Sequence, residues 1–346
     1  MSDSSSFALS VLDITPVPSG STPVDAIRNT LDLAKHADRL GYHRFWVAEH
    51  HNSTGEASSA PAVLVGQIAS ATSSIRVGAG GVMLPNHSSL VVAEQFGVLE
   101  ALHPGRIDLG IGRAPVDPLT AQALERPAGA QNGSLFPRQL SDLIGYFGAA
   151  SGEKPITAVP ASAANHPPVW ILGSSPSSAQ LAAALGLPYA FANHLNGDAC
   201  IPSMKLYREQ FRPSAVLDRP YAIVTAMLVA ADTDEQAEWL WGTLGLAAIK
   251  MRKGYVGPYP SPEEAAAHPY TPAEREFLQS RLARHLVGGP EAVRRKTEDF
   301  VARTGADELM AFSLIHDHAA RVRSHEVLAE TFGIADAASR PLSQVG

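Results

Sequence analysis

The pattern that most clearly indicates the fold lies in residues 75–113, IRVGAGGVMLPNHSSLVVAEQFGVLEALHPGRIDLGIGR. A short apolar run begins this stretch at 75–80, and a second one ends it at 106–111. The residues between them include an apolar segment, 88–102, that is long enough for a helix. Strand, helix and strand in this order are typical of a βαβ unit, in which the two strands run parallel.

The same alternation extends in both directions along the chain. We predict strands at 7–12, 43–48, 75–80, 106–111, 168–172, 189–192, 220–229 and 307–312. Segments of helical period lie between them, for example at 23–40 and at 232–249. Because crossovers between parallel strands are right-handed, eight such units in sequence close most simply into a barrel. The predicted fold class is α/β, a (β/α)8 TIM-like barrel.

A single domain, residues 1–346, accounts for the whole length. Two stretches exceed what a minimal barrel needs, at about 114–166 and 250–285, and we interpret both as insertions. The second contains MRKGYVGPYPSPEEAAAHPY, and long irregular loops rich in Pro, Gly and Tyr are often lids. The two tails, 1–6 and 335–346, are rich in small polar residues and are expected to fray.

Composition and charge limit the possible partners. The chain is 45% hydrophobic and 18% charged, as expected of a globular protein with a large core. Its formal net charge is -7 and no Lys/Arg run occurs, so nucleic acid and anionic membranes are not expected partners. A single cysteine, Cys200, and the lack of a leader-like or membrane-spanning apolar stretch predict a reducing, cytoplasmic location.

Polar residues and glycines follow five successive predicted strands. The chemistry of barrel enzymes lies at the carboxyl ends of the strands, so these positions form the candidate site. In chain order they are Glu49-His50-His51, Gly80-Gly81, Arg113, the serine cluster Ser174-Ser175-Pro176-Ser177-Ser178, and Asn193-His194.

The serine cluster is followed by SAQLAAALG (178–186), which is typical of a helix. Backbone N–H groups in its first turn and the serine hydroxyls would converge on one anion. Arg113 could close this cradle with a charge-assisted contact. The residues alone are also compatible with serines that only cap the helix and with an Arg113 in a surface ion pair. Together they point to a phosphorylated ligand.

His50 suits proton transfer, because the reference pKa of histidine lies near 6.5. Adjacent histidines on an extended segment point to opposite sides, so at most one of His50 and His51 faces the barrel mouth. A metal site built on Glu49, His50 and His51 is not expected, since no HExxH-like spacing and no second set of ligands is present. The alternative for His50, His51 and His194 is a core histidine that bonds a backbone group.

Three blocks of sequence carry a resemblance to a known family. The first comprises WVAEHHN (46–52) and RVGAGGVMLPNHSSLVVAEQFGVLEALHPGRIDLGIGRAP (76–115); the others are VWILGSSPSSAQLAAALGLPYAFANH (169–194) and HLVGGPEAVRRKTEDFVARTGADELMAF (285–312). Their order resembles the bacterial luciferase-like, flavin-dependent monooxygenases. The resemblance implies an oxidoreductase that binds reduced FMN (FMNH2), usually supplied by a separate NAD(P)H:flavin reductase. It further implies a hydroperoxide at flavin C4a, formed with O2, that oxygenates a small organic substrate.

The resemblance also implies roles for particular residues. His50 matches the family's active-site histidine, and Arg113, Ser175 and Ser178 match positions that grip the FMN phosphate. Gly80-Gly81 matches the site of a non-prolyl cis peptide under the isoalloxazine ring, where the lack of side chains lets a flat ring approach. A plain Gly-rich strand end would have the same sequence. Asn193 and His194, after the sixth strand, complete the predicted cofactor-binding set.

Two departures from the family pattern limit this transfer. Light-emitting members carry a cysteine where this chain has Gly112, and the tryptophan expected after the sixth strand is Asn193 here. Strong bioluminescence is therefore not predicted.

Two alternative functions and one mode of assembly are also considered for this chain. A related barrel enzyme could use a deazaflavin for hydride transfer, but its longer charged tail would need more basic residues than Arg113. A flavin-binding protein without turnover is the alternative outside enzymology. Family members often dimerise, and the apolar segments 59–72 and 88–102 could serve a core or a homodimer interface.

Overall fold

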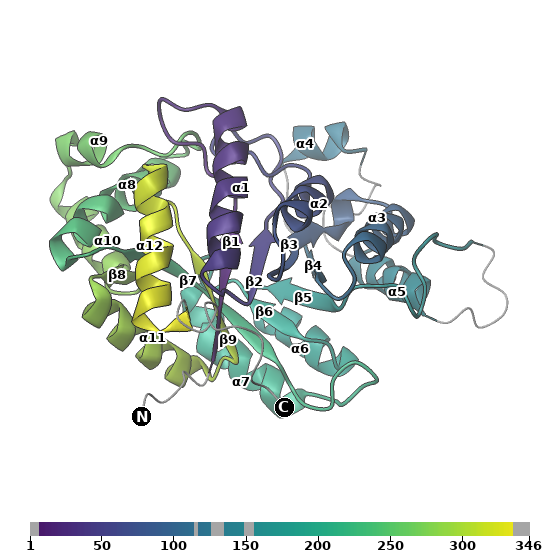
Figure 1. Ribbon diagram of the computed structural model, residues 1–346. Helices are drawn as coiled ribbons and strands as arrows, with labels where there is room; N and C mark the ends of the chain where they lie inside the picture. The colour runs from purple at the N-terminus through teal and green to yellow at the C-terminus, as the bar shows by residue number, and fades with distance from the viewer. Residues whose placement is uncertain (1–6, 114–116, 126–134, 149–155, 335–346) are drawn as a thin grey trace. The chain divides into compact units, whose positions relative to one another are not determined.

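The computed structural model describes residues 7–113, 117–125, 135–148 and 156–334. Its strands are β1 (Ala8–Asp13), β2 (Arg44–Val47), β3 (Arg76–Met83), β4 (Ile107–Gly112), β5 (Val169–Gly173), β6 (Tyr189–Phe191), β7 (Ala222–Ala230), β8 (Leu286–Gly288) and β9 (Glu308–Phe312). The strand order is β6-β5-β4-β3-β2-β1-β9-β7-β8, and a β6–β7 pairing closes the sheet (Figure 1). The predicted (β/α)8 barrel is confirmed. The predicted frayed tails lie outside the described residues, as do parts of the first predicted insertion.

Several helices begin directly after a residue whose side chain caps the first turn. Thr22 and Thr233 each accept a hydrogen bond from a backbone N–H in the first turn, ahead of α1 and α8 respectively. No described helix combines the length and apolar composition needed to cross a membrane. The α-helices are α1 (Pro23–Arg39), α2 (Pro61–Ala71), α3 (Ser89–Leu102), α4 (Pro118–Ala123), α5 (Phe136–Phe147), α6 (Pro176–Leu185), α7 (Cys200–Gln210), α8 (Asp234–Arg252), α9 (Pro262–Ala267), α10 (Pro272–Leu282), α11 (Pro290–Thr304) and α12 (His318–Thr331), with 3-10 turns η1 (Leu84–Asn86) and η3 (Gly197–Ala199).

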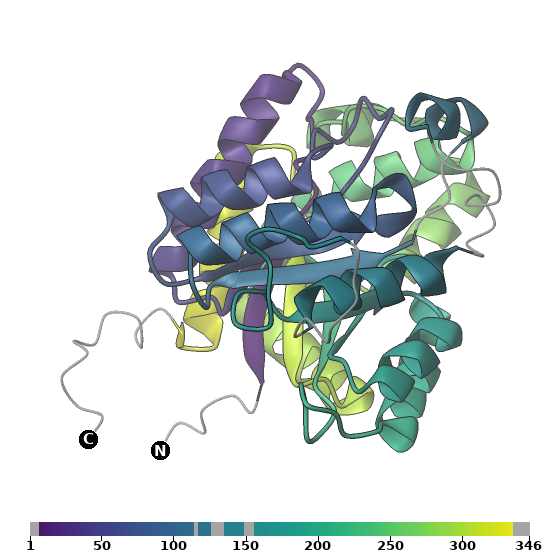
Figure 2. The same cartoon turned by 90° about the vertical axis from the view of Figure 1, so that its right-hand side faces the viewer.

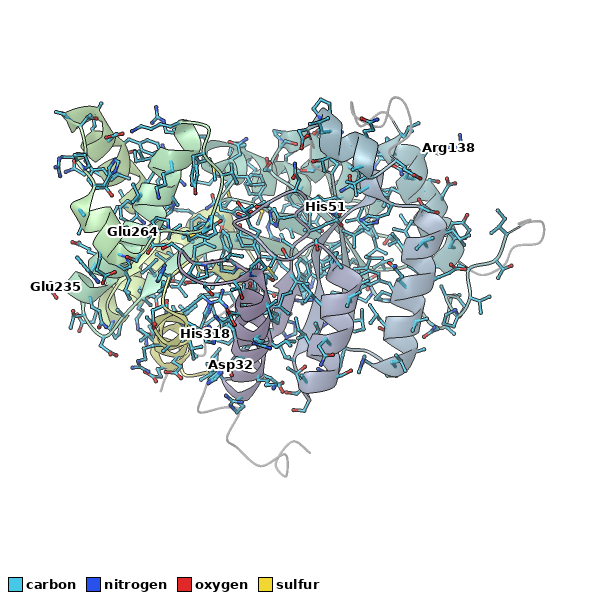
Figure 3. The ribbon with its side chains drawn as sticks, turned by 90° about the horizontal axis from the view of Figure 1, so that it is seen from above. Asp32, His51, Arg138, Glu235, Glu264 and His318 are labelled. Atoms are coloured by element: carbon cyan, nitrogen blue, oxygen red, sulfur yellow. The ribbon has the colours of Figure 1, made fainter. Side chains whose placement is uncertain are left out.

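The chain divides into two compact units, and the first contains both ends of the described chain, 7–45 and 223–334, together with 53–57. Within it β9 pairs in parallel with β1 and β7, and β7 pairs with β8. Helices α1 and α12 lie side by side in Figure 1. His318 Nε2, at the start of α12, lies 2.8 Å from Asp32 Oδ2 of α1, and Figure 3 shows the two residues next to each other.

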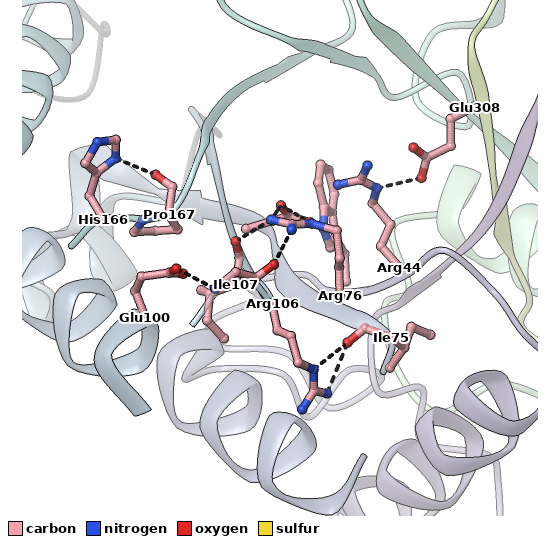
Figure 4. Close-up of polar contacts among 12 residues, drawn as sticks. Arg44, Ile75, Arg76, Glu100, Arg106, Ile107, His166, Pro167 and Glu308 are labelled. Carbon is pink, nitrogen blue, oxygen red and sulfur yellow. Dashed lines mark hydrogen bonds and ion pairs between the residues drawn. The ribbon is translucent and has the colours of Figure 1, made fainter. Parts of the chain in front are cut away.

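The second unit comprises Trp46–Asn52 and Ser58–Ala222. Its parallel ladders join β3 to β4, β4 to β5 and β5 to β6. Helices α2 and α3 lie side by side (Figure 2), and they pack on β3 and β4 respectively. Two arginines secure the amino ends of these strands (Figure 4): Arg76 donates to the buried Asp108 at 2.7 Å, and Arg106 donates to Ile75 O at 3.0 Å.

The second predicted insertion differs from the expectation in its secondary structure. The expected irregular loop at 250–285 contains the end of α8 and two helices, α9 and α10. Pro262 and Pro272 stand in the first turns of these helices, where a missing N–H costs nothing. Ser261 and Thr271 each form a capping box with a glutamate three residues later. The sequence pattern predicts an irregular loop around these prolines, but in the structure they lie at the starts of helices.

Candidate functional site

The predicted site residues all lie in the second unit, on or just after five strands that run parallel. His50 follows β2, Arg113 follows β4, Ser175 and Ser178 follow β5, and Asn193 and His194 follow β6. Gly80 and Gly81 lie inside β3, which continues to Met83, three residues beyond the predicted end of that strand. The five strand ends therefore deliver their side chains and backbone within one compact unit.

The Gly80–Gly81 peptide bond is cis, as the resemblance implies. The register between β3 and β4 shifts between Gly80 and Val82, so the strand is irregular at this point. A Cβ on Gly81 would lie 2.8 Å from the carbonyl oxygen of Gly110, which is closer than real Cβ atoms come. Glycine at position 81 is thus required by the packing of β3 against β4.

His50 and His51 have separate surroundings, as their adjacency in an extended segment predicts. His50 donates its backbone N–H to Ser58 O at 2.9 Å, and its Nδ1 lies 3.4 Å from Ser58 Oγ. His51 instead has its Nε2 2.8 Å from Glu49 Oε1. The charge of His50 acts on the pKa of His194, so these two imidazoles lie near each other. His51 belongs to a separate cluster around Glu49.

Glu49 is one of the candidate positions after β2, and its contact with His87 was not predicted from the sequence. The Glu49 side chain is fully buried and contacts the Nε2 atoms of His51 and His87 at 2.8 and 2.9 Å. Ligand atoms of these three residues lie within 4.8 Å of one another, a spacing that could hold a metal ion. This group is not Glu49, His50 and His51, for which no metal site was expected: His87 stands in the place of His50. His87 follows β3 through the turn η1. In the sequence it stands within the block that resembles the family, and no role was predicted for it.

Arg113 and the serines after β5 meet at the amino end of α6. Arg113 is exposed, and its Nη2 lies 3.4 Å from Ser177 Oγ, which in turn lies 2.9 Å from Ser175 Oγ. The Ser175 side chain makes no capping bond to the helix, contrary to a purely capping role. Ser178 differs from its neighbours: its hydroxyl donates to Ser175 O at 2.7 Å and lies 3.0 Å from Tyr189 Oη.

Asn193 and His194 lie in the turn after β6, and both are half-buried. The neighbouring Asn196 donates its side-chain amide to Ser174 O at 3.0 Å, which connects this turn to the serine cluster. Burial lowers the pKa of His194 to about 4, and the nearby charge of His50 acts in the same direction. His194 is therefore uncharged at neutral pH.

The model of the luciferase-like monooxygenase family matches residues 5–128 and 137–308, most of the chain. The chain belongs to the luciferase-like monooxygenase family. The uncharacterized protein YvbT of Bacillus subtilis (strain 168) is 48% identical over 326 residues, 94% of this chain and 96% of YvbT. A luciferase-like monooxygenase of Escherichia coli (strain K12) is 45% identical over 321 residues, 92% of this chain and 95% of the relative.

Solved structures with a similar fold include the following three proteins. The crystal structure of apo-MsnO8 is 38% identical, with a TM-score of 0.86 over 95% of this chain and 99% of that one. The oxygenating constituent of 3,6-diketocamphane monooxygenase from Pseudomonas putida, in complex with FMN, is 20% identical with a TM-score of 0.72, covering 95% and 98% of the two chains. An F420-dependent secondary alcohol dehydrogenase is 16% identical with a TM-score of 0.63, covering 95% and 99%. Two of these structural neighbours are thus described with different cofactors, FMN in one and F420 in the other.

Proposed function

We propose that this chain is a monooxygenase that uses reduced FMN and O2 to oxygenate a small organic substrate. The observation that carries the proposal is the group of Arg113, Ser175 and Ser177 at the amino end of α6. It stands on the same unit as His50 and the Gly80–Gly81 peptide. A phosphate-bearing flavin has the two parts that such a group and such a strand would bind.

The serine and arginine group fits a phosphate. The amino end of a helix carries a partial positive charge and directs N–H groups outward. Ser175 and Ser177 offer hydroxyl donors, and Arg113 offers a guanidinium whose charge-assisted bonds contribute about 1.5–3 kcal/mol each. Ser178, which was predicted for the phosphate site together with Arg113 and Ser175, supports the turn from inside through Ser175 O and Tyr189 Oη.

Gly80 and Gly81 present a strand without side chains, against which we propose that the flavin ring lies. Reduced FMN, when bound, supplies the two electrons that activate O2. We assign proton transfer beside the ring to His50, because an imidazole titrates near neutral pH. The neutral His194 next to it takes part as an uncharged hydrogen-bonding group, because its pKa of about 4 keeps it unprotonated. Asn193, in the same turn, completes the proposed cofactor-binding set.

The test of this proposal is an anaerobic titration of the purified protein with FMN, chemically reduced FMN and a reduced deazaflavin, followed by oxygen uptake. We expect reduced FMN to bind and the complex to consume O2. Preferred binding of the deazaflavin without oxygen uptake would identify a hydride-transfer enzyme. Flavin binding without oxygen consumption would identify a carrier protein, and no binding of any of them would contradict the cofactor assignment.

Formation of reduced FMN from FMN consumes two electrons, so the proposed reaction needs an electron donor. We therefore also propose that an NAD(P)H:flavin reductase supplies the reduced flavin to this chain. Adding such a reductase with NADPH should sustain oxygen uptake that FMN alone does not support.

A further inference from the structure

The Glu49 carboxylate is buried and saturated with hydrogen-bond partners. Its Oε1 lies 2.8 Å from both Asn86 Nδ2 and His51 Nε2. Its Oε2 accepts the backbone N–H of Met83 at 2.9 Å. His87 Nε2 lies 2.9 Å from both oxygens. Among the described residues, the partners of this anion are therefore two imidazoles, an amide and a backbone N–H.

A buried carboxylate is costly unless such partners compensate for lost hydration. Burial acts to raise the pKa of Glu49, but the hydrogen bond and charge of His87, with the bonds from Asn86 and Met83, hold the pKa below its usual value. Glu49 is therefore ionised at neutral pH. An apolar residue at this position would avoid the desolvation cost of a buried carboxylate. The hydrogen bonds that Glu49 makes therefore call for an explanation.

The partners of Glu49 come from two segments that both border the proposed flavin site. Glu49 and His51 flank His50 in the chain, directly after β2. Met83 is the last residue of β3, two positions after Gly81, and His87 closes the turn η1 that follows. The carboxylate thus joins the segment that carries the proposed proton-transfer residue to the strand that is proposed to face the flavin ring.

We propose that Glu49 is a positioning residue, which connects the end of β2 to the Met83–His87 segment and so holds His50 and Gly80–Gly81 in the geometry for binding flavin. This inference rests on the proposed flavin function. Glu49 acts through its neighbours, because its own oxygens are taken up by their N–H groups. Preorganisation of this kind reduces the ordering that must accompany ligand binding.

The same three side chains could instead share a metal ion, because their ligand atoms lie within 4.8 Å of one another. Two observations favour hydrogen bonding. The N···O distances of 2.8 and 2.9 Å are those of hydrogen bonds. The Met83 N–H and the Asn86 amide already donate to the two carboxylate oxygens. Metal binding is therefore an outcome that the experiment must be able to detect.

The test compares Glu49→Gln with Glu308→Gln. Glu308 is equally buried and pairs with Arg44 (Figure 4), and it lies at the first residue of β9 rather than at a carboxyl end. Both variants lose a buried carboxylate, so both should unfold more easily. We expect Glu49→Gln alone to raise the dissociation constant of reduced FMN, by about tenfold or more, and to shift the absorbance of bound FMN. Glu308→Gln should change the dissociation constant by less than about twofold.

A second pair of variants covers the case in which Glu49→Gln does not fold. His87→Ala removes a donor to the carboxylate, whereas His87→Gln keeps an amide N–H there. We expect His87→Ala to weaken FMN binding and His87→Gln to recover most of the loss. Equal binding by wild type, His87→Ala and any folded Glu49→Gln would overturn the proposal.

Nitrogen NMR of histidine-labelled protein without flavin separates this inference from the proposed function. The wild type should show Nε2-protonated His51 and His87, with proton shifts typical of strong hydrogen bonds, and His87→Ala should alter the His51 signal. If these signals appear but no flavin binds, the hydrogen-bonded centre stands and its role in positioning flavin is overturned with the proposed function. Stoichiometric Zn2+ binding that is lost in His51→Ala and His87→Ala would overturn the inference in favour of a metal site.

Discussion

Arg113 follows β4 with an exposed side chain whose guanidinium contacts Ser177 Oγ at 3.4 Å. An exposed cation at the amino end of a helix gains little from its protein neighbours, and a bound phosphate would give it a partner of opposite charge. We therefore expect a change at Arg113 to affect the proposed binding of phosphate more than it affects the stability of the fold.

Replacing this residue tests the phosphate assignment. We expect Arg113→Ala to weaken FMN binding by about 10-fold to 100-fold, because one charge-assisted bond of about 1.5–3 kcal/mol is lost. The measurement is fluorescence titration with FMN and with riboflavin, which lacks the phosphate. Riboflavin affinity should stay unchanged. Arg138→Ala is the control, since Arg138 is also exposed and lies on α5 (Figure 3). Equal losses of FMN and riboflavin affinity would refute a phosphate contact.

For single residues, the sequence predicted where the candidate site residues stand in the chain better than it predicted which residues they contact. The division of His50 from His51 follows from the alternation of an extended segment, and the structure has it. The bond between Glu49 and His87 joins residues 38 positions apart and depends on how the turn η1 folds back, which no local pattern encodes. The contact of Arg113 with Ser177 depends in the same way on rotamers at the start of α6.

The C-terminus of α6 has a glycine that its surroundings require. Gly186 has a φ of +62°, and a Cβ there would lie 2.5 Å from Arg212 O and from Ser214 Cβ. Gly105 has a similar φ of +73° with no atom within 4 Å of such a Cβ. We expect Gly105→Ala to cost about 1–2 kcal/mol of unfolding free energy, and Gly186→Ala to cost roughly 1–3 kcal/mol more. Urea unfolding measures both, and equal losses would show that the close contact is relieved without cost.

A buried histidine on α12 makes stability depend on pH. His325 is 1% exposed, and burial with the charge of Arg321 lowers its pKa to about 3. The unfolded chain takes up a proton near pH 6.5 and the folded chain does not, so stability is lost as pH falls below about 6.5.

The slope due to this group is about 1.4 kcal/mol per pH unit. His325→Phe keeps an aromatic ring against Tyr42 and removes the titration. We expect the wild type to lose about 2 kcal/mol relative to this variant between pH 7 and about pH 5, measured by urea unfolding. Parallel pH profiles would mean that His325 is not buried uncharged.

At the element scale the apolar periodicity predicted the barrel strands to within three residues, because buried parallel strands read as nearly continuous apolar runs. β7 is buried along its whole length and illustrates the rule. The three-residue β8 was not predicted, because it is too short to show a period and owes its strand geometry to pairing with β7. The helices α9 and α10 were missed because their prolines resemble those of turns.

At the scale of the whole molecule, α2 and α3 expose apolar side chains that a single chain does not bury. Val63 on α2 is 71% exposed and Leu102 on α3 is 67% exposed, with Val91 and Val98 also exposed. Exposed apolar side chains on two helices that pack against each other can form part of an interface. We propose that two copies of the chain associate through this surface.

Light scattering coupled to size exclusion measures this association. The wild type should elute as a dimer, and Val63→Asp and Val98→Asp should shift it to monomer by burying a charge in the interface. Val216→Asp, at an exposed valine before β7, is the control and should leave the dimer intact. A monomeric wild type would rule out the proposed assembly.

Rapid mixing of the anaerobic protein, saturated with reduced FMN, with oxygenated buffer tests whether the chain binds reduced FMN and directs its reaction with O2. We expect an oxygen-dependent absorbance change that is distinct from that of oxidised FMN and that decays more slowly than free reduced FMN reoxidises. The His50→Ala variant should show a smaller change. Reoxidation at the rate of free reduced FMN, with no intervening absorbance change in the wild type, would contradict the proposed function.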